Sequence, residues 1–451
     1  MVKYREKAIF YLKKPFVTNS FFFGIGHVGF LVARLMRDIF LAHTMGSHLF
    51  GSWAAFNILR QYGGYTDLGL FNGLTREIPR VRDNKTLLQE YVNIAAFGTF
   101  LATLGLIVWF ILFEMESYVS PDTTRVSILL MLAFIAFEKI YKYFNSLFVG
   151  FADLKKAGIF LLILSAADLG LAIFGAVYGG LQGILVGTVA AIVLTSMVMY
   201  RFRPISVGWE FSRPSFKSLA SSSLLLMCFG LLNVALKNLD RTSFIFLKGD
   251  DVILGSHHAA SLVAMSVSIL PFIFVSVINP RIYAFRQEQN EEILDVIKKY
   301  GSVCCVIGCL LAIVVHFLGP WIGAVFFPKQ EFISVILPYL LGVEVFIAAS
   351  LVLDAVIVVK NRGSMILGYK ALVLGLFMAG RVLYFYTQGI ESSLVLATDL
   401  SKSLMCVHML CFLGSLSYVL FLCRGHLGSK TLKILGVWPI LLTLTVIILL
   451  N

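Results

Sequence analysis

Apolar residues gather along the chain in runs that end at basic or turn-forming residues. Twelve of these runs have about the 20 residues that a helix needs to cross a bilayer. They predict helices at 16–43, 47–73, 91–113, 125–149, 157–178, 182–200, 218–247, 254–280, 299–318, 332–359, 365–387 and 394–422. A last run, 434–450, is barely long enough and contains Pro439, so it is either a thirteenth span or an interfacial segment.

The composition is that of an all-α polytopic membrane protein. The 451 residues are 59% hydrophobic and 14% charged, and no connection between the runs is long enough for a soluble domain. The basic N-terminal stretch leads into an apolar run without a small-residue cleavage site, so we expect the first helix to be retained. The seven cysteines lie in or beside apolar runs, and we expect buried apolar side chains, not disulfides or metal ligands.

The distribution of basic residues predicts the orientation. With the N-terminus inside, the inner connections hold 24 Lys and Arg residues and the outer connections hold 3, namely Arg125, Lys248 and Lys329. Because cytoplasmic loops carry the excess of basic residues, the N-terminus is predicted to be cytoplasmic. The net charge of +12 is then explained by loops beside anionic lipid headgroups, and no nucleic-acid partner is expected.

Two stretches about two hundred residues apart resemble each other. "RDIFLAHTMGSHLFGSW" and "DRTSFIFLKGDDVILGSHH" both contain an acid–base pair, a glycine at the tip (Gly46, Gly249) and a glycine opening the returning helix (Gly51, Gly255). Such a repeat predicts two six-helix halves related by an axis along the membrane normal. The predicted organisation is a bundle at 1–200, a cytoplasmic linker at 201–217, a second bundle at 218–422 and an extra hydrophobic segment at 423–451.

Ten Lys and Arg residues fall inside the predicted helices. A basic residue at the centre of a lipid-facing helix costs about 2.5 to 3.5 kcal/mol, so several together should face protein or a wet cavity. Lys370 lies near an inner end, where its side chain can reach the membrane surface. Four of the others belong, together with an aspartate, to two triplets with the spacing i, i+3, i+4. The triplets are Arg34, Arg37 and Asp38, and Lys237, Asp240 and Arg241. This spacing places each triplet on one face of its helix.

These charges have two interpretations. They are either pairs that lock helices together, such as Glu138 with Lys142 or Asp399 with Lys402, or the lining of a cavity that binds an anion. Arg60 and Arg381 have no acid within one turn, and Arg can hold a phosphate bidentately, so we favour the anion site. The candidate binding residues are Arg34, Arg37, Arg60, Lys237, Arg241 and Arg381. The candidate charge partners or ion-coupling residues are Asp38, Asp168 and Asp240.

The sequence contains few features of catalytic, metal-binding or ATP-binding proteins. The chain contains no Gly-Lys phosphate loop, no H-E-x-x-H and no Cys-x-x-Cys. We therefore expect no ATP hydrolysis and no bound metal or cofactor, and we expect that the protein is not an enzyme. His257 and His258 follow Gly255 at the predicted outer tip, where a solvated interfacial position is expected rather than a proton relay.

The stretch 33–80, "ARLMRDIFLAHTMGSHLFGSWAAFNILRQYGGYTDLGLFNGLTREIPR", resembles the opening of polysaccharide-type (Wzx-like) flippases of the multidrug/oligosaccharidyl-lipid/polysaccharide exporter superfamily. The similar features are a glycine-containing turn after the first helix, a glycine opening the second, and "TDLGL" before an inner-loop arginine, Arg76. "LDRTSFIF" and "LGSHHAAS" in the second half are also similar. A histidine follows the first turn where an aromatic or acidic residue is more usual, and the extra C-terminal run fits neither a twelve- nor a fourteen-helix form.

The resemblance implies a MATE/MOP-like fold of 12 or 13 transmembrane helices, in two pseudo-symmetric six-helix bundles around a central cavity. It implies a monomer in the bacterial cytoplasmic (inner) membrane that flips an undecaprenyl-diphosphate-linked oligosaccharide to the outer leaflet by alternating access. The implied partners are that substrate, membrane lipids, and polysaccharide polymerase and chain-length proteins, in a pathway such as O-antigen or lipopolysaccharide biosynthesis. The alternatives are a cation-coupled multidrug exporter of the same superfamily, a lipid II flippase, and a nonenzymatic subunit of a polysaccharide-synthesis complex.

Overall fold

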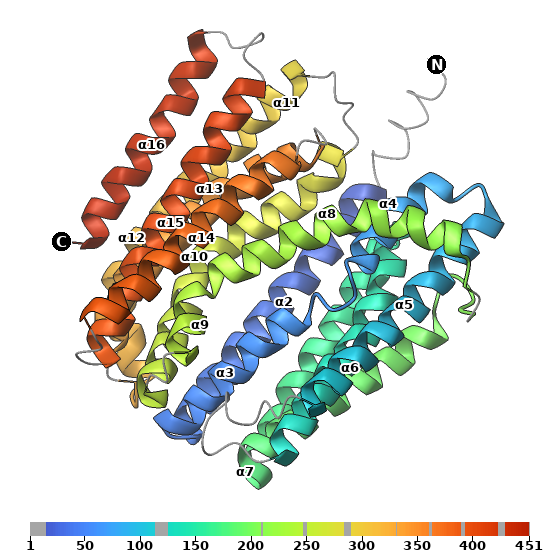
Figure 1. The fold of residues 1–451 in the computed structure, drawn as a ribbon, viewed down its shortest axis with the longest axis horizontal. Helices are drawn as coiled ribbons and strands as arrows, with labels where there is room; N and C mark the ends of the chain where they lie inside the picture. Colours follow the sequence, from blue (N-terminus) through green and yellow to red (C-terminus); the bar gives the residue numbers. More distant parts are fainter. Residues whose placement is uncertain are drawn as a thin grey trace. The chain divides into compact units, whose positions relative to one another are not determined.

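A computed structural model describes residues 15–112, 125–208, 211–246, 250–283, 290–330, 332–359, 363–388, 393–422 and 429–450. Throughout these ranges the secondary structure is helical, without a strand (Figure 1). The helices of the first half are α2 (Pro15–Thr44), α3 (Ser47–Gly63), α4 (Leu70–Val81), α5 (Lys85–Leu112), α6 (Arg125–Gly150) and α7 (Leu154–Arg201). Those that follow are α8 (Arg213–Lys237), α9 (Leu239–Phe246), α10 (Asp251–Tyr283), α11 (Asn290–Val296), α12 (Ser302–Phe326), α13 (Ile333–Val359), α14 (Gly363–Gln388), α15 (Ser393–Leu422) and α16 (Ser429–Leu450).

Five helical stretches of the described residues are long and apolar enough to cross a membrane. They are Leu154–Arg201, Asp251–Val275, Ile293–Phe326, Ile333–Ile357 and Leu394–Leu422. The third of these runs from α11 through one π-helical turn, Ile297–Gly301, into α12. The all-helical prediction is thus confirmed, with changes at three helices.

Helix α7 contains the predicted helices 157–178 and 182–200 as a tight hairpin. Its turn is at Gly180, whose φ of 53° and ψ of −135° are accessible to glycine and strained for other residues. Below the turn the two arms are in backbone contact, because a Cβ added to Gly183 would lie 1.9 Å from the carbonyl oxygen of Gly175. Glycines therefore supply both the reversal and the close approach.

The predicted helix 47–73 is interrupted, which corrects the sequence interpretation. Residues 64–69 form a turn between α3 and α4, and Leu68 and Gly69 have positive φ values of 54° and 71°. Lys139 of α6 holds this turn by donating to the Gly64 carbonyl at 2.6 Å and to Asp67 Oδ1 at 3.4 Å. A buried lysine from another helix thus stabilises a break that the local apolar pattern conceals. The predicted helix 218–247 is likewise interrupted, by one residue, at Asn238.

The chain divides into two compact units. The first holds Met1–Thr44 and Leu59–Gly230, and the second holds Met45–Ile58 and Leu231–Asn451. They differ from the predicted bundles at two segments. The first part of α8 packs within the first unit, where Ser223 lies against Gly73. The beginning of α3 packs against α10 within the second unit, where Gly51 adjoins the Asp251 carbonyl and Gly255 adjoins the Ser47 carbonyl. The two glycines that the repeat identified therefore permit close helix approach.

Within the first unit, the connection after α7 is fastened to α5. Gln89 Nε2 donates to the Ser206 carbonyl at 2.9 Å, and the Gly208 amide donates to Asn93 Oδ1 at 2.7 Å. Further along, Ser218 Oγ lies 2.9 Å from the Tyr91 hydroxyl. Ser206 and Gly208 of the predicted linker 201–217 are thus docked against α5.

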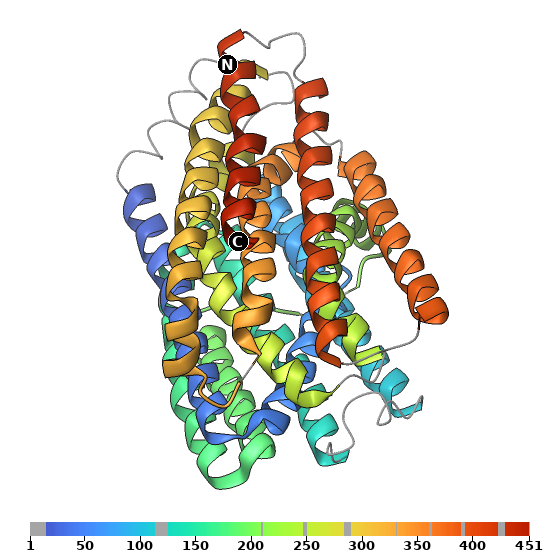
Figure 2. The same cartoon turned by 90° about the vertical axis from the view of Figure 1, so that its left-hand side faces the viewer.

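Within the second unit, α16 packs along α12 and α13, and Figure 2 shows these helices side by side. Trp438 Nε1 donates to Ser302 Oγ at 3.0 Å, and the indole ring covers Gly301. The apolar part of α16, Leu435–Leu450, is shorter than the five candidate spans. Pro439 lies inside this helix without ending it.

Candidate functional site

An arginine and two aspartates form a buried ionic triad in the first unit. Arg37 of α2 donates through Nη1 to Asp168 Oδ2 of α7 at 2.7 Å, and through Nε and Nη2 to Asp38 Oδ1 at 3.1 and 3.0 Å. None of the three residues is more than 5% exposed. The three formal charges sum to −1, so Arg37 has no spare positive charge to offer a ligand. Of the predicted site residues, the structure brings Arg37, Asp38 and Asp168 together.

Arg34 and Arg60, also in the first unit, are less fully compensated. Arg60 Nη1 is 3.9 Å from Glu138 Oε1, and its Nε has no hydrogen-bond partner within the described residues. Glu138 also pairs with Lys142 at 3.1 Å, which confirms that predicted pair. Across the described part of the chain, no carboxylate lies within the 4.0 Å ion-pair distance of Arg34, which interacts electrostatically with Arg60 and Glu138. Three bases thus share Glu138, and Arg34 also interacts electrostatically with Asp38 and Asp168 of the triad.

Aromatic rings accompany both of these arginines. The Arg34 guanidinium carbon is 5.4 Å from the centroid of Phe30, and that of Arg60 is 5.5 Å from the centroid of Phe134. A guanidinium over a ring face keeps its N–H groups available at the edge, because the ring contacts only its plane. We call Arg34, Arg60, Lys142 and Glu138 the first-unit cationic cluster, with a formal charge of +2.

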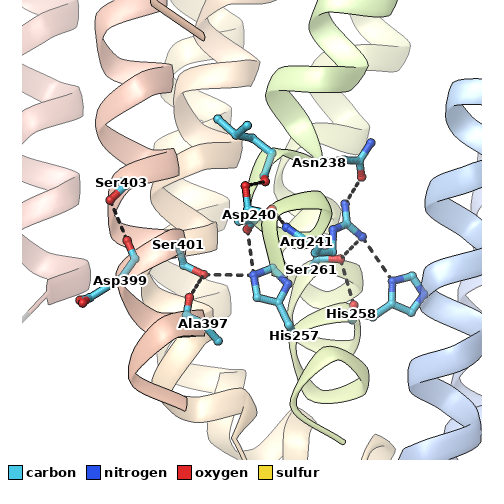
Figure 3. A network of polar contacts seen from close by, with 12 residues as sticks. Asn238, Asp240, Arg241, His257, His258, Ser261, Ala397, Asp399, Ser401 and Ser403 are labelled. Carbon is cyan, nitrogen blue, oxygen red and sulfur yellow. Dashed lines mark hydrogen bonds and ion pairs between the residues drawn. The ribbon is translucent and has the colours of Figure 1, made fainter. Parts of the chain in front are cut away.

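Two residues of the predicted triplet on the second half, Asp240 and Arg241, lie in a polar network of the second unit (Figure 3). Lys237 of α8 pairs with Glu344 Oε1 of α13 at 3.0 Å. His257 Nε2 of α10 lies 2.8 Å from Asp240 Oδ2 and 3.0 Å from Ser401 Oγ of α15. Asp240 Oδ1 accepts from the backbone amide of Arg241 at 2.7 Å. Five helices, α8, α9, α10, α13 and α15, thus contribute polar residues to this region.

Arg241 is held by neutral side chains in that network. Its Nη2 donates to Asn238 Oδ1 at 2.5 Å, and its Nη1 donates to Ser261 Oγ and approaches His258 Nδ1, both at 3.3 Å. The residue is 4% exposed. Arg241 thus donates to neutral side chains, whereas Arg37 donates to two carboxylates.

Sequence reasoning misplaced the two histidines. His257 and His258 were expected in a solvated position at the tip, yet each is only 4% exposed. They lie two turns inside α10, packed against α9, α15 and the start of α3. The signal that could have identified them is the adjacent "GSHH" at the beginning of an apolar run, where a buried polar group needs a partner.

The remaining intramembrane bases have diverse positions. Lys370 is buried, not extended to the membrane surface, and binds both oxygens of Asp354 at 2.8 and 3.0 Å. Lys402 lies 3.7 Å from Asp399 of the same helix, α15, so the predicted pair forms within one helix and does not join two. The side chain of Arg381 lies outside the described residues, so its predicted role remains a prediction.

The structure also bears on the cysteines and on metals. Cys304, Cys305, Cys309 and Cys411 are buried as expected, whereas Cys228 is half-buried and Cys406 is exposed; Cys423 lies outside the described residues. Among the residues described, no group of three His, Cys, Asp or Glu side chains could hold a metal ion.

No family model matches the sequence, and no curated protein is similar to it. Solved structures are similar in fold. A multidrug-resistance MATE-family transporter of the MOP superfamily, in an inward-facing conformation, matches with a TM-score of 0.69 at 13% identity, over 90% of this chain and 100% of its own. A multidrug-resistance MATE-family transporter of the MOP superfamily in an outward-facing conformation matches with a TM-score of 0.65 at 16% identity, over 91% of this chain and 96% of its own.

The MATE transporter VcmN of Vibrio cholerae, in a bent form, matches with a TM-score of 0.58 at 15% identity, over 90% and 97%. The coverage is nearly complete in both directions, so these transporters share the architecture of the whole chain. The chain therefore has the all-helical fold of MATE transporters of the MOP superfamily, as predicted.

Proposed function

We propose that the chain is a flippase that moves a polyprenyl-diphosphate-linked oligosaccharide, of the undecaprenyl type, to the outer leaflet of the cytoplasmic membrane. The observation that carries the proposal is the formal charge of +2 on the first-unit cationic cluster. Two arginines with edge N–H groups suit a diphosphate, because each guanidinium can contact two phosphate oxygens. Arg34 and Arg60 are proposed as binding residues, and Lys142 is added to them.

The residues of the second unit support the same kind of ligand. Lys237 is 28% exposed on its side chain although it pairs with Glu344, so its ammonium group can accept a further anionic contact. Arg241 is oriented by hydrogen bonds to Asn238 and Ser261. Arg37, in contrast, is proposed as a structural residue because two carboxylates occupy its guanidinium group.

A cation-coupled multidrug exporter is the second candidate. Asp168 Oδ1 is buried and has no hydrogen-bond partner within the described residues, and a carboxylate of this kind could bind a cation. The solved structures of similar fold also include a multidrug-resistance transporter. Yet a cationic drug at Asp38 or Asp168 would have to displace Arg37, which already holds both acids. The net charge of the first-unit cluster also repels a cation, so the anionic substrate is favoured.

The test is leaflet transfer in proteoliposomes that contain the purified protein alone. A labelled polyprenyl-diphosphate oligosaccharide is compared with a cationic dye, for the wild type and for Arg60→Gln. Loss of a charge-assisted contact of about 1.5 to 3 kcal/mol predicts a decrease in transfer of roughly 10- to 100-fold. Lys402→Gln is the matched control, because it also removes one intramembrane positive charge. The Lys402 side chain is half exposed and pairs with Asp399, outside the cluster.

Three outcomes separate the candidates. Transfer of the glycan lipid that decreases in Arg60→Gln and not in Lys402→Gln supports the flippase and its anion site. Dye transfer without glycan-lipid transfer identifies the exporter. Transfer of neither compound by folded protein contradicts both transport assignments and favours a nonenzymatic subunit.

A further inference from the structure

The connection between α7 and α8, together with the helix ends beside it, carries exposed bases and exposed aromatic rings. The bases are Arg201, Arg203, Arg213 and Lys217; Arg203 is half-buried and the other three are exposed. Across the described residues, no carboxylate lies within the 4.0 Å ion-pair distance of any of the four. Phe202 and Phe211 are 54% and 51% exposed. We call these six residues the linker patch.

The linker patch lies on the side of the membrane that the sequence predicts to be cytoplasmic. Several other bases on that side pair with an acid three residues earlier in the chain, namely Arg80 with Glu77 at 2.9 Å, Lys156 with Asp153 at 2.7 Å and Lys298 with Asp295 at 3.0 Å. Two acids accompany the patch: Glu210, outside the described residues, and Glu90 of α5, to which Ser215 donates. If both are counted against the four bases, a formal charge of +2 remains. The patch therefore lacks the counter-charge that the other bases have.

Both ends of the connection are fastened to the same short stretch of α5. The first end is held by Gln89 and Asn93, through the Ser206 carbonyl and the next amide but one. The second end is held by Glu90 and Tyr91, which hydrogen-bond two serines of α8. These four α5 residues lie within about 6 Å along the helix axis. The bases of the linker patch are therefore kept near one end of α5.

The ring of Phe211 lies deeper along α5 than these fixed points. Its centroid is 5.7 Å from that of Phe97, and the Phe216 ring packs against it at 5.6 Å. Phe97 is about 12 Å further along α5 than Gln89, toward the predicted interior of the membrane. Segments that lie in a membrane interface have this arrangement, with bases at the level of the headgroups and apolar rings below them.

Arg203 is held in place before any ligand binds. Its Nη1 donates to the Tyr200 carbonyl at 2.8 Å, and its guanidinium carbon is 4.0 Å from the centroid of the Tyr200 ring. The ring covers one face of the guanidinium and leaves N–H groups at its edge. An arginine fixed in this way loses little conformational freedom when it binds a phosphate.

Three kinds of partner carry the negative charge that the linker patch lacks: an acidic protein, a nucleic acid and an anionic phospholipid. The phospholipid is favoured, because it offers phosphate to the bases and acyl chains to the rings at the same time. The connection is also fastened to α5, a predicted membrane helix, so lipid headgroups are its immediate surroundings. A soluble partner would have to reach the Phe211 ring, which lies below the level of the bases.

We propose that the linker patch binds the headgroups of anionic phospholipids in the adjacent leaflet. Arg203 is the pre-oriented phosphate contact, the exposed bases add attraction for negative charge, and the Phe211 ring lies among the acyl chains. Each base beside an anionic surface increases the affinity by about fivefold. The site is separate from the first-unit cationic cluster and does not depend on which substrate the protein transports.

The test identifies the lipid that touches Phe211. This residue is replaced by the photo-cross-linking amino acid p-benzoyl-phenylalanine in the full chain, which is placed in liposomes of equal phosphatidylglycerol and phosphatidylcholine. Both lipids contain a phosphate, and only phosphatidylglycerol has a net negative charge. After illumination, mass spectrometry of the cross-linked peptide gives the ratio of the two lipids. We expect phosphatidylglycerol to exceed phosphatidylcholine by about fivefold or more.

Two double variants in this background assign the preference to the linker patch. Arg203→Gln/Arg213→Gln removes two of its bases and should bring the ratio close to one, because two factors of about five are lost. Lys156→Gln/Lys298→Gln is the matched control, since it removes the same charge from the same predicted side, at bases that pair with Asp153 and Asp295. The control should keep the ratio of the parent.

The other outcomes would overturn the proposal. Folded protein that forms no lipid adduct at position 211 would show that the connection does not face the bilayer, and would favour an acidic protein as the partner. Equal amounts of the two lipids would show that the linker patch does not select negative charge. An equal decrease of the ratio in both double variants would assign the preference to the overall charge of that side and not to the patch.

Discussion

Replacement of Arg37 by methionine should destabilise the protein strongly, because it would leave Asp38 and Asp168 buried without their counter-ion. Arg37 makes three N–H···O contacts of 2.7 to 3.1 Å. If the three bonds were independent, at about 1.5 to 3 kcal/mol each, their sum would exceed the loss of stability that is typical when a buried ion pair is broken. Two of the three share one oxygen, Asp38 Oδ1, so the contacts are not additive. We expect a loss of about 3 to 5 kcal/mol in the free energy of unfolding.

The measurement is denaturant-induced unfolding in detergent, followed by tryptophan fluorescence. Arg34→Met is the matched control, because it removes the same side chain one turn earlier on α2, and no described carboxylate lies within ion-pair distance of Arg34. The control should stay within about 1 kcal/mol of the wild type. The triple variant Arg37→Met/Asp38→Asn/Asp168→Asn removes all three charges and should recover about half of the loss or more.

Two results would refute this reasoning. Wild-type stability of Arg37→Met would mean that the two acids do not depend on the arginine. An equal loss in the single and triple variants would mean that packing of the arginine side chain matters, and not the unpaired carboxylates. A triple variant that is stable and still transports glycan lipid would confirm Arg37 as a structural residue and remove it from the binding residues predicted from sequence.

Two further predictions concern backbone turns. Gly180→Ala should lower the stability of the α7 hairpin by about 1 to 2 kcal/mol because its φ is 53°, whereas Gly179→Ala, with open space around it and no positive φ, should be nearly neutral in the same unfolding assay. Lys139→Met should cost about 3 to 5 kcal/mol because it leaves the buried Asp67 unpaired and the Gly64 carbonyl without its donor. Lys142→Met, one turn away and 39% exposed, should cost less than about 1 kcal/mol. Equal losses in either matched pair would contradict the explanation given for that turn.

The positions of the helices could be predicted well, since an apolar run of about 20 residues in a membrane protein indicates a helix that crosses the bilayer. The reversal near Gly180 was also predictable, because "YGGLQG" interrupts two apolar runs. The break at 64–69 carries a similar signal, "YGGYTDLG", which the prediction of a single helix 47–73 passed over. What the sequence does not indicate is the lysine that stabilises this break, because it comes from another helix. Hydropathy reports the medium around a segment and carries little information on where a helix is interrupted by a distant side chain.

The candidate site was predictable in residue type and only partly in role. Local spacing identified the pairs Glu138–Lys142 and Asp399–Lys402 correctly. The pairing of Arg37 with Asp168 could not be predicted, because the two residues are 131 positions apart in the sequence. His257 was misplaced for the same reason, since its contacts come from α9 and α15. Whether a charge is spare or neutralised depends on long-range pairing, which a single sequence without known contacts does not specify.

The fastening of Ser206 and Gly208 to α5 has a practical consequence for topology mapping. Reporter proteins are commonly inserted into connections between membrane helices to show which side of the membrane each connection faces. Here an insertion would have to separate Gln89 and Asn93 from the Ser206 carbonyl and the Gly208 amide. A reporter in this connection would thus disturb the protein whose orientation it reports, and epitope tags of a few residues are the better choice.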